Sequence, residues 1–292
     1  MIDKKKNVIL VIGATGQQGS AVADSLMRHG WKIRALTRGK RPEALAALEA
    51  KKIDAVVGDM NDSSSLRAAM KGAYGVFAMT TSMEEGPQAE IAHGLATADA
   101  ALDAGIKHFI FSSVGAADKH TGIPFFDSKR EIELYIRRKK LPATIFRPVS
   151  FMSNYLRPDT RKAILGGVFR SPSPAEGKLQ LLALEDYGEF VDIAFENRDE
   201  WLGREMEIAS DELTMRSIAD TFAQVLGHDV RYERFPVEET KKMGEAMYKM
   251  ALWHMTHDFD ADLKVLRAIY PRLTRLEQWL RSHGWREFAK AS

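Results

Sequence analysis

Residues 8–19 read Val-Ile-Leu-Val-Ile-Gly-Ala-Thr-Gly-Gln-Gln-Gly, an apolar run that passes directly into a glycine-rich turn. The apolar run predicts a buried strand, and the amphipathic segment after the glycines predicts a helix. In a dinucleotide-binding turn, Gly13 would allow the tight turn, Gly16 the close approach of a diphosphate, and Gly19 the packing of the helix on the sheet. The alternative is a glycine turn that binds no ligand, because the spacing is GxxGxxG and not the commoner GxGxxG of dinucleotide-binding turns. The predicted phosphate-binding residues are Gly13, Thr15, Gly16, Gln17, Gln18 and Gly19.

A basic loop follows the second apolar run, residues 32–36. A site that prefers NAD would place an acidic residue here to hold the ribose 2′-hydroxyl, and none is present. Arg38 can instead form a forked hydrogen bond to a 2′-phosphate, while Lys40 or Arg41 adds positive charge. We therefore predict NADP(H) as the cofactor. The alternative is a basic loop that contacts only solvent.

Composition excludes several classes of protein. The 292 residues include no cysteine, which excludes disulfides, thiolate metal sites and a thiol redox switch. The net charge of +2, with both signs interspersed, argues against direct nucleic-acid binding. No apolar run approaches the roughly 20 residues that span a bilayer. The first strand follows the amino end so closely that we expect no signal peptide, and hence a cytoplasmic protein.

Short apolar runs alternate with helical patterns up to residue 150, which is typical of a series of βαβ units. The sequence thus predicts an α/β fold, a Rossmann-type doubly wound parallel sheet in residues 1–150 that binds NADP(H). Residues 151–292 are predicted to form a smaller α+β lobe for substrate or partner, and the two can interleave. The further strands of the sheet are expected near 55–57, 74–79, 109–112 and 143–146.

Ligands bind beyond the carboxyl ends of parallel strands, so the residues after each run are candidates for contact with the cofactor. Asp59 is expected to accept a hydrogen bond from the adenine amine, and Thr80 and Ser112 to lie by the middle and the nicotinamide end. Each hydroxyl can equally serve a turn or a helix cap. The candidates in this group are Asp59, Met60, Thr80, Thr81 and Ser112.

In the second half of the chain, the spacing of apolar residues indicates helices and strands less clearly. Helices are predicted at 185–196 and 215–226, a short strand at 205–208, and a polar helix start at 210–214. An apolar stripe in residues 243–255 is interpreted as core, the alternatives being a pocket lining or a dimer seam. The stripe contains Met243, Met247, Met250, Trp253, His254 and Met255. His254 and His257 lack the carboxylates that would complete a metal site, so we expect no metal.

Segments along nearly the whole chain resemble the NmrA-like branch of the atypical short-chain dehydrogenases/reductases. The more specific ones are Phe125-Phe-Asp-Ser-Lys-Arg-Glu-Ile-Glu133, Thr144-Ile-Phe-Arg-Pro148 and Phe151-Met-Ser-Asn154; the others are 11–19, 34–38, 56–60 and 263–279. The resemblance implies a Rossmann domain with a small substrate lobe, and it adds Pro148 and Phe151 to the cofactor-binding residues. Such proteins include NADPH-dependent reductases of quinones or phenolic compounds and NADP(H)-binding regulators.

Short-chain dehydrogenases generally use a Tyr-x-x-x-Lys pair, in which the lysine lowers the pKa of the tyrosine that transfers the proton. Phe125 stands at the tyrosine position and cannot donate a proton. Lys129 remains as the catalytic candidate, to hold the ribose hydroxyls or to act as acid or base itself. Other candidate donors are Ser112, Ser113 and His120, the last more readily explained as a surface loop residue.

Two functions follow from these observations. The first is an NADPH-dependent reductase of a small aromatic or quinoid acceptor. The second is a non-catalytic sensor of NADPH and NADP+ that acts through a protein partner. Either function is compatible with a monomer or a homodimer.

Overall fold

The computed structural model describes residues 2–291, the side chains of 290 and 291 excepted. The chain divides into two compact units. The first consists of Met1–His120, Pro124–Arg147 and Tyr187–Met206. The second consists of Thr121–Ile123, Pro148–Asp186 and Glu207–Ser292. The chain thus returns to the first unit after residue 186.

The first unit is built on a seven-stranded sheet with the order β10-β6-β5-β4-β1-β2-β3, in which β1 to β6 run parallel. This order, reversing at β1 and β4, is that of a dinucleotide-binding fold. The predicted α/β class is confirmed, as are the expected strands. Their bounds are β1 Val8–Ile12, β2 Lys32–Thr37, β3 Asp54–Val57, β4 Gly75–Met79, β5 His108–Ser112, β6 Ala143–Pro148 and β10 Glu205–Ile208.

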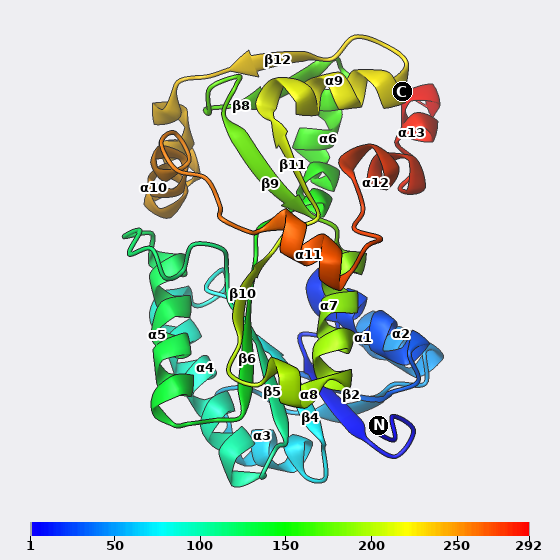
Figure 1. Cartoon of the computed structure of the whole chain (residues 1–292), viewed down its shortest axis with the longest axis vertical. Coiled ribbons are helices and arrows are strands. Elements are labelled where there is room, and N and C mark those ends of the chain that lie inside the picture. The colour runs from blue at the N-terminus through cyan, green and yellow to red at the C-terminus, as the bar shows by residue number, and fades with distance from the viewer. Residues whose placement is uncertain (1, 292) are drawn as a thin grey trace. The chain divides into compact units, whose positions relative to one another are not determined.

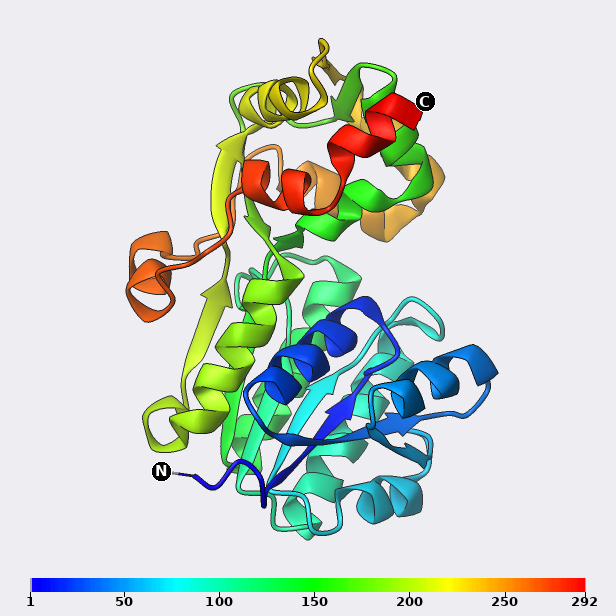
Figure 2. The same ribbon diagram turned by 90° about the vertical axis from the view of Figure 1, so that its right-hand side faces the viewer.

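Helices cover both faces of this sheet (Figure 1). One face carries α3, α4 and α5, and the other carries α1, α2 and α7. The short helix α8 follows α7 in the chain. Figure 2 shows α1 and α7 side by side, where Ser25 donates a hydrogen bond to Glu189. The bounds are α1 Gln17–Arg28, α2 Pro42–Ala50, α3 Ser63–Met70, α4 Gly86–Asp103, α5 Pro124–Arg138, α7 Leu184–Glu196 and α8 Arg198–Trp201.

Burial explains why these segments fold as they do. All of β5 and β6 is buried, as expected for parallel strands covered on both faces. Asp62 begins α3 by accepting a hydrogen bond from the backbone N–H of Ser64, as N-cap residues do. The core between the sheet and α3–α5 includes Leu10, Val76 and Ile132. The residues at the carboxyl edge of the sheet therefore follow strands that are packed on both faces.

The second unit has its own core, which includes Met152, Phe222 and Trp279. It holds a three-stranded sheet, β11-β9-β7, and a two-stranded one, β12-β8. Its strands are β7 Ser150–Phe151, β8 Val168–Ser171, β9 Lys178–Leu182, β11 Asp211–Thr214 and β12 Arg231–Arg234. Its helices are η1 Met152–Leu156, α6 Pro158–Leu165, α9 Met215–Leu226, η2 Val237–Met243, α10 Glu245–Trp253, α11 Leu263–Ile269, α12 Leu276–Ser282 and α13 Trp285–Ala291.

The polar helix start predicted at 210–214 is confirmed at Thr214, which caps α9. Residues 211–214 also form β11, paired with β9, a strand that the sequence did not predict. One prediction for the second half was wrong. The methionine stripe is not core: Met243 is 62% exposed, and Ala251 is the one buried residue of α10. The helix contacts mainly the short η2 that precedes it in the chain. Across residues 2–291 no helix has the length and apolarity to cross a membrane.

Candidate functional site

The glycine turn between β1 and α1 has the close contacts that the sequence predicts. A Cβ on Gly19 would lie 2.2 Å from the carbonyl oxygen of Gly13, and Gly13 itself has a φ of +85°. Gly16 is the N-cap of α1, with no side chain capping the helix, and its N–H donates to the Gly13 carbonyl over 2.9 Å. A Cβ on Gly16 would meet only that oxygen, at 3.4 Å. The turn is therefore closed on the helix side and open at Gly16.

The basic loop contacts protein as well as solvent. Arg38 pairs with Glu84, with 2.9 Å between the Arg38 Nη1 and the carboxylate, and the hydrogen bond to Glu84 raises the pKa of Arg38. Arg41 donates a hydrogen bond of 3.0 Å to the hydroxyl of Thr15 in the glycine turn. Lys40 is exposed. The loop after β2 is thus tied both to the glycine turn and to the segment after β4.

The residues after β3 and β4 mostly stabilise turns. The Asp59 carboxylate accepts from the backbone N–H of Asn61, and Met60 packs partly buried on the core. The Thr81 hydroxyl accepts from the N–H of Met83. These are the turn roles that the sequence left open as alternatives, and the predicted contacts of Asp59, Met60 and Thr81 with a cofactor stay predictions.

Lys129 lies where β4 and β5 end. The Lys129 Nζ donates to the carbonyl oxygen of Thr80 over 2.7 Å, to the Thr80 hydroxyl over 3.0 Å and to the carbonyl oxygen of Ser112 over 3.3 Å. It also forms an ion pair of 3.1 Å with Glu90. Burial lowers the pKa of Lys129, while Glu90 acts in the opposite direction. The structure therefore brings three of the predicted residues, Thr80, Ser112 and Lys129, to one point at the carboxyl edge of the sheet.

Glu90, on α4, is the residue of this cluster that the sequence analysis missed. It is 1% exposed and accepts hydrogen bonds from the hydroxyls of Thr80 and Ser128. The sequence contains a pattern that points to Glu90. It lies on the same helix face as the small residues Gly94 and Ala98, at intervals of four residues. Small residues on that face allow another helix to pack closely on it, which makes Glu90 a candidate for burial.

The remaining proton-donor candidates lie differently. Ser112 accepts from the hydroxyl of Tyr187 over 2.8 Å, so its side chain is engaged on the side of α7. His120 is exposed and has a φ of +53°, in keeping with a loop residue. Phe125, at the place of the usual tyrosine, is half-buried and packs edge-on against Phe126. Ser113 is 5% exposed. Lys129 is the candidate with a buried cationic donor, held at the ends of β4 and β5.

Pro148 and Phe151 belong to the second unit. Pro148 ends β6, and Phe151 lies in β7, where it pairs with Leu182 of β9. Their predicted contact with a cofactor stays a prediction.

Arg147, the residue before Pro148, fixes the loop that follows β5. Its guanidinium donates two hydrogen bonds to Glu133, of 2.8 and 2.7 Å, one to Asp118 and one to Glu205. Burial alone would lower the pKa of Arg147, but the bonds to Glu133 outweigh it and the pKa is raised. Because Asp118 lies in the loop after β5, this network ties the loop to α5 and β10.

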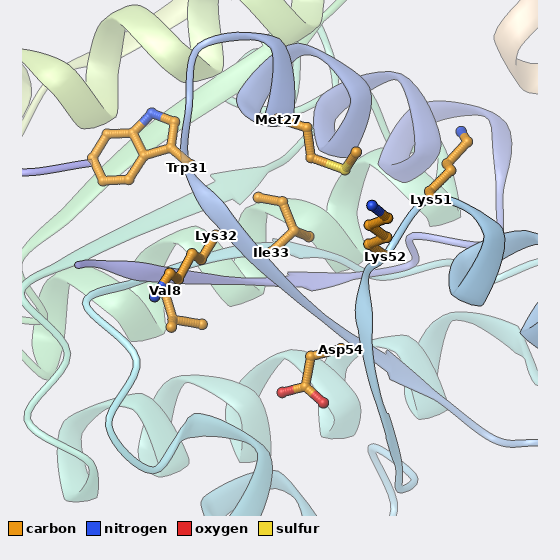
Figure 3. Close-up of a pocket in the computed structure, with 8 residues that line it drawn as sticks. All are labelled: Val8, Met27, Trp31, Lys32, Ile33, Lys51, Lys52 and Asp54. Carbon is orange, nitrogen blue, oxygen red and sulfur yellow. The ribbon is translucent and has the colours of Figure 1, made fainter. Parts of the chain in front are cut away.

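A shallow pocket of about 500 Å³ opens at the opposite edge of the sheet (Figure 3). Val8, Lys32 and Asp54, the first residues of β1, β2 and β3, line it together with Lys51 and Lys52. Ligands of parallel sheets bind at the carboxyl ends, so this pocket is not the candidate site. Among the described residues no group of His, Asp and Glu is arranged to hold a metal ion.

The sequence matches the model of the NmrA-like family over residues 5–284. The chain belongs to this family. An NmrA-like family domain-containing oxidoreductase of Aspergillus hancockii is 30% identical over 80% of this chain and 76% of its own length. The predicted membership is thus confirmed.

Solved structures share the fold at low identity. A triphenylmethane reductase of Citrobacter sp., complexed with NADP(H), has a TM-score of 0.81 at 19% identity, covering 94% of this chain and 99% of its own. NmrA, a negative transcriptional regulator solved with NADP, has a TM-score of 0.78 at 21% identity, covering 98% and 96%. An NADPH-dependent quinone oxidoreductase of Escherichia coli, solved with NADPH, has a TM-score of 0.77 at 23% identity, covering 94% and 99%.

Proposed function

We propose that this protein is an NADPH-dependent reductase of a small aromatic or quinoid acceptor, with Lys129 as its catalytic residue. The observation that carries the proposal is the position of Lys129, buried and held by Thr80 and Ser112 at the carboxyl ends of β4 and β5. Parallel sheets of this order bind nicotinamide dinucleotides at that edge. The names of the Aspergillus, Citrobacter and E. coli relatives support an oxidoreductase.

The residues of the first unit fit NADPH. The turn from Gly13 to Gly19 has no side chain at its open position, Gly16, where a diphosphate can approach the amino end of α1. Arg38 offers a planar pair of donors to a 2′-phosphate, which would take the place of Glu84. Lys129 would hold the ribose hydroxyls in place of one of its present acceptors. Bound NADPH would supply a hydride to the acceptor.

The reduction of a quinone to a hydroquinone takes one hydride and one proton. Phe125 cannot donate that proton, whereas the ammonium of Lys129 can, either directly or after exchange with water. A quinoid acceptor suits this site because its oxygen gains electron density as the hydride arrives and becomes basic enough to be protonated by a weak donor. Alcohol oxidation would demand a stronger, positioned base.

The second candidate is a sensor of NADPH and NADP+, in which the ion pair between Arg38 and Glu84 would couple nucleotide binding to the loop, while the distinction between the two nucleotides would arise at the nicotinamide, since both carry the 2′-phosphate. This pair joins the loop after β2 to the segment after β4, and a 2′-phosphate that displaced Glu84 would release that connection. A sensor must bind NADPH and NADP+ with different affinities, since equal affinities shift no population. Calorimetric titration with both nucleotides tests this candidate: equal dissociation constants contradict it. Consumption of NADPH on addition of a quinone tests the reductase.

The choice of cofactor depends on Arg38. We expect Arg38→Ala to weaken NADPH binding by about 1.5–3 kcal/mol, the range of hydrogen bonds to charged groups, and to leave NADH binding nearly unchanged. The measurement is the dissociation constant of each nucleotide for wild type and variant. Arg67→Ala is the matched control, because Arg67 is a half-exposed arginine on α3 that pairs with Asp103. Equal losses for NADPH and NADH would show that Arg38 is structural.

A further inference from the structure

The hydrogen bonds around Lys129 favour its ammonium form. Its polar neighbours all present acceptors: the carbonyl oxygens of Thr80 and Ser112, the Thr80 hydroxyl and the Glu90 carboxylate. The Thr80 hydroxyl donates its one hydrogen bond to Glu90 Oε1, over 3.1 Å, so it can only accept a hydrogen bond from Lys129. A neutral amine has two protons for these acceptors, and an ammonium has three.

Glu90 is in turn arranged as a carboxylate. Its Oε1 faces the Thr80 hydroxyl and the Lys129 Nζ, and its Oε2 accepts from the Ser128 hydroxyl over 2.5 Å. Three donors converge on an acid that is 1% exposed. A buried carboxylate with this set of donors is the counter-charge of the buried lysine.

The packing of two helices brings the pair together. A Cβ on Gly94 of α4 would lie 2.5 Å from side-chain atoms of Ile132 of α5. Gly94 is one turn beyond Glu90, and Ile132 is one turn beyond Ser128. The absence of a side chain at Gly94 therefore lets α4 approach α5 closely enough for Glu90 to reach Ser128 and Lys129.

We propose that Glu90 is a positioning residue that holds Lys129 as an ammonium and fixes it at the ends of β4 and β5. The role of that ammonium in turnover rests on the proposed function, but the pairing itself does not. The other titratable groups near Lys129 are Glu133 on its own helix and Tyr187, whose hydroxyl lies against Ser112. Glu133 already pairs with Arg147 and Arg130, which leaves Glu90 as the carboxylate in direct contact with Lys129.

The test is a pH titration of Lys129 in the protein without nucleotide, followed by NMR of lysine labelled at Cε. The Lys129 signal is assigned by its loss in Lys129→Met. In Glu90→Gln the neutral amide no longer offsets the effect of burial on the pKa of Lys129, so the midpoint of the Lys129 titration moves to lower pH. In Glu90→Asp, which retains the charge and the fold, the midpoint lies between those of Glu90→Gln and the wild type. Glu85→Gln, an exposed acid at the start of α4, is the control and leaves the midpoint unchanged.

A second readout follows turnover. The alkaline loss of kcat/KM with NADPH and a quinone should move to lower pH in Glu90→Gln, so at mildly alkaline pH the rate should fall below that of wild type. An unchanged Lys129 titration in Glu90→Gln and Glu90→Asp would overturn the positioning role. A shifted titration in a protein that consumes no NADPH would overturn the reductase and leave the positioning role standing.

Discussion

Lys129→Met should lower kcat for NADPH-dependent reduction by about 100- to 10,000-fold, the range of a positioned proton donor. Methionine has a similar length but neither charge nor N–H donors, so it can neither hold ribose hydroxyls nor protonate the acceptor. The measurement is steady-state turnover at saturating NADPH. Lys107→Met is the matched control, because Lys107 is exposed and precedes β5 at the opposite edge of the sheet. A variant with wild-type turnover would remove Lys129 from the mechanism.

The same substitution leaves Glu90 buried without its counter-charge, so a loss of stability must be separated from a loss of catalysis. Breaking a buried ion pair by removing one partner destabilises by about 3–5 kcal/mol. The double variant Lys129→Met/Glu90→Gln removes both charges and should recover much of the melting temperature while remaining inactive. Recovery of turnover together with stability would mean that Lys129 acts only on folding.

Gly19→Ala should impair both folding and cofactor binding. The added methyl group would lie 2.2 Å from the Gly13 carbonyl oxygen and 2.4 Å from its carbon, so the backbone of the turn must move. Overpacking of this kind destabilises by about 1–3 kcal/mol, and the displaced turn no longer presents the amino end of α1 to a diphosphate. Thermal unfolding and NADPH titration measure the two effects. An unchanged melting temperature and affinity would contradict the close packing of the turn.

Gly16→Ala separates binding from folding. Its φ of −99° suits alanine, and the methyl group would meet only the Gly13 oxygen, at 3.4 Å. The melting temperature should therefore stay near that of wild type, while a clash with the diphosphate of about 1–3 kcal/mol weakens NADPH binding about 5- to 150-fold. Gly166→Ala in the second unit, with a φ of −78° and similar contacts, is the control that should change neither. Wild-type affinity in Gly16→Ala would place the diphosphate elsewhere.

The sequence predicted those features whose cause is local. A continuous apolar run such as Val8–Ile12, followed directly by a glycine-rich turn, indicates a buried strand, and the spacing of Gly13 and Gly19 reflects contacts within seven residues of chain. Lys129 could be named because it belongs to a motif that the family resemblance carries. The NmrA-like family and the Rossmann-type sheet were therefore within reach of the sequence alone.

Features that depend on distant packing were not. Glu90 meets Lys129 only because Gly94 lets α4 approach α5, and these residues are far apart in the chain. Residues 187–206 return to the first unit because β10 adds to the edge of the sheet beside β6. The Met-rich stripe has the spacing of a buried helix, but spacing does not reveal whether another element is available to cover it.

The most direct test of a catalytic reductase is the near-ultraviolet absorbance of NADPH when the purified protein meets a panel of small quinones, phenylpropenoids and aldehydes. The proposed function predicts that at least one aromatic or quinoid acceptor is reduced with consumption of one NADPH per acceptor, and that Lys129→Met lowers the rate of this reaction about 100- to 10,000-fold. Tight binding of NADPH with no turnover on any acceptor would contradict a reductase and favour the sensor.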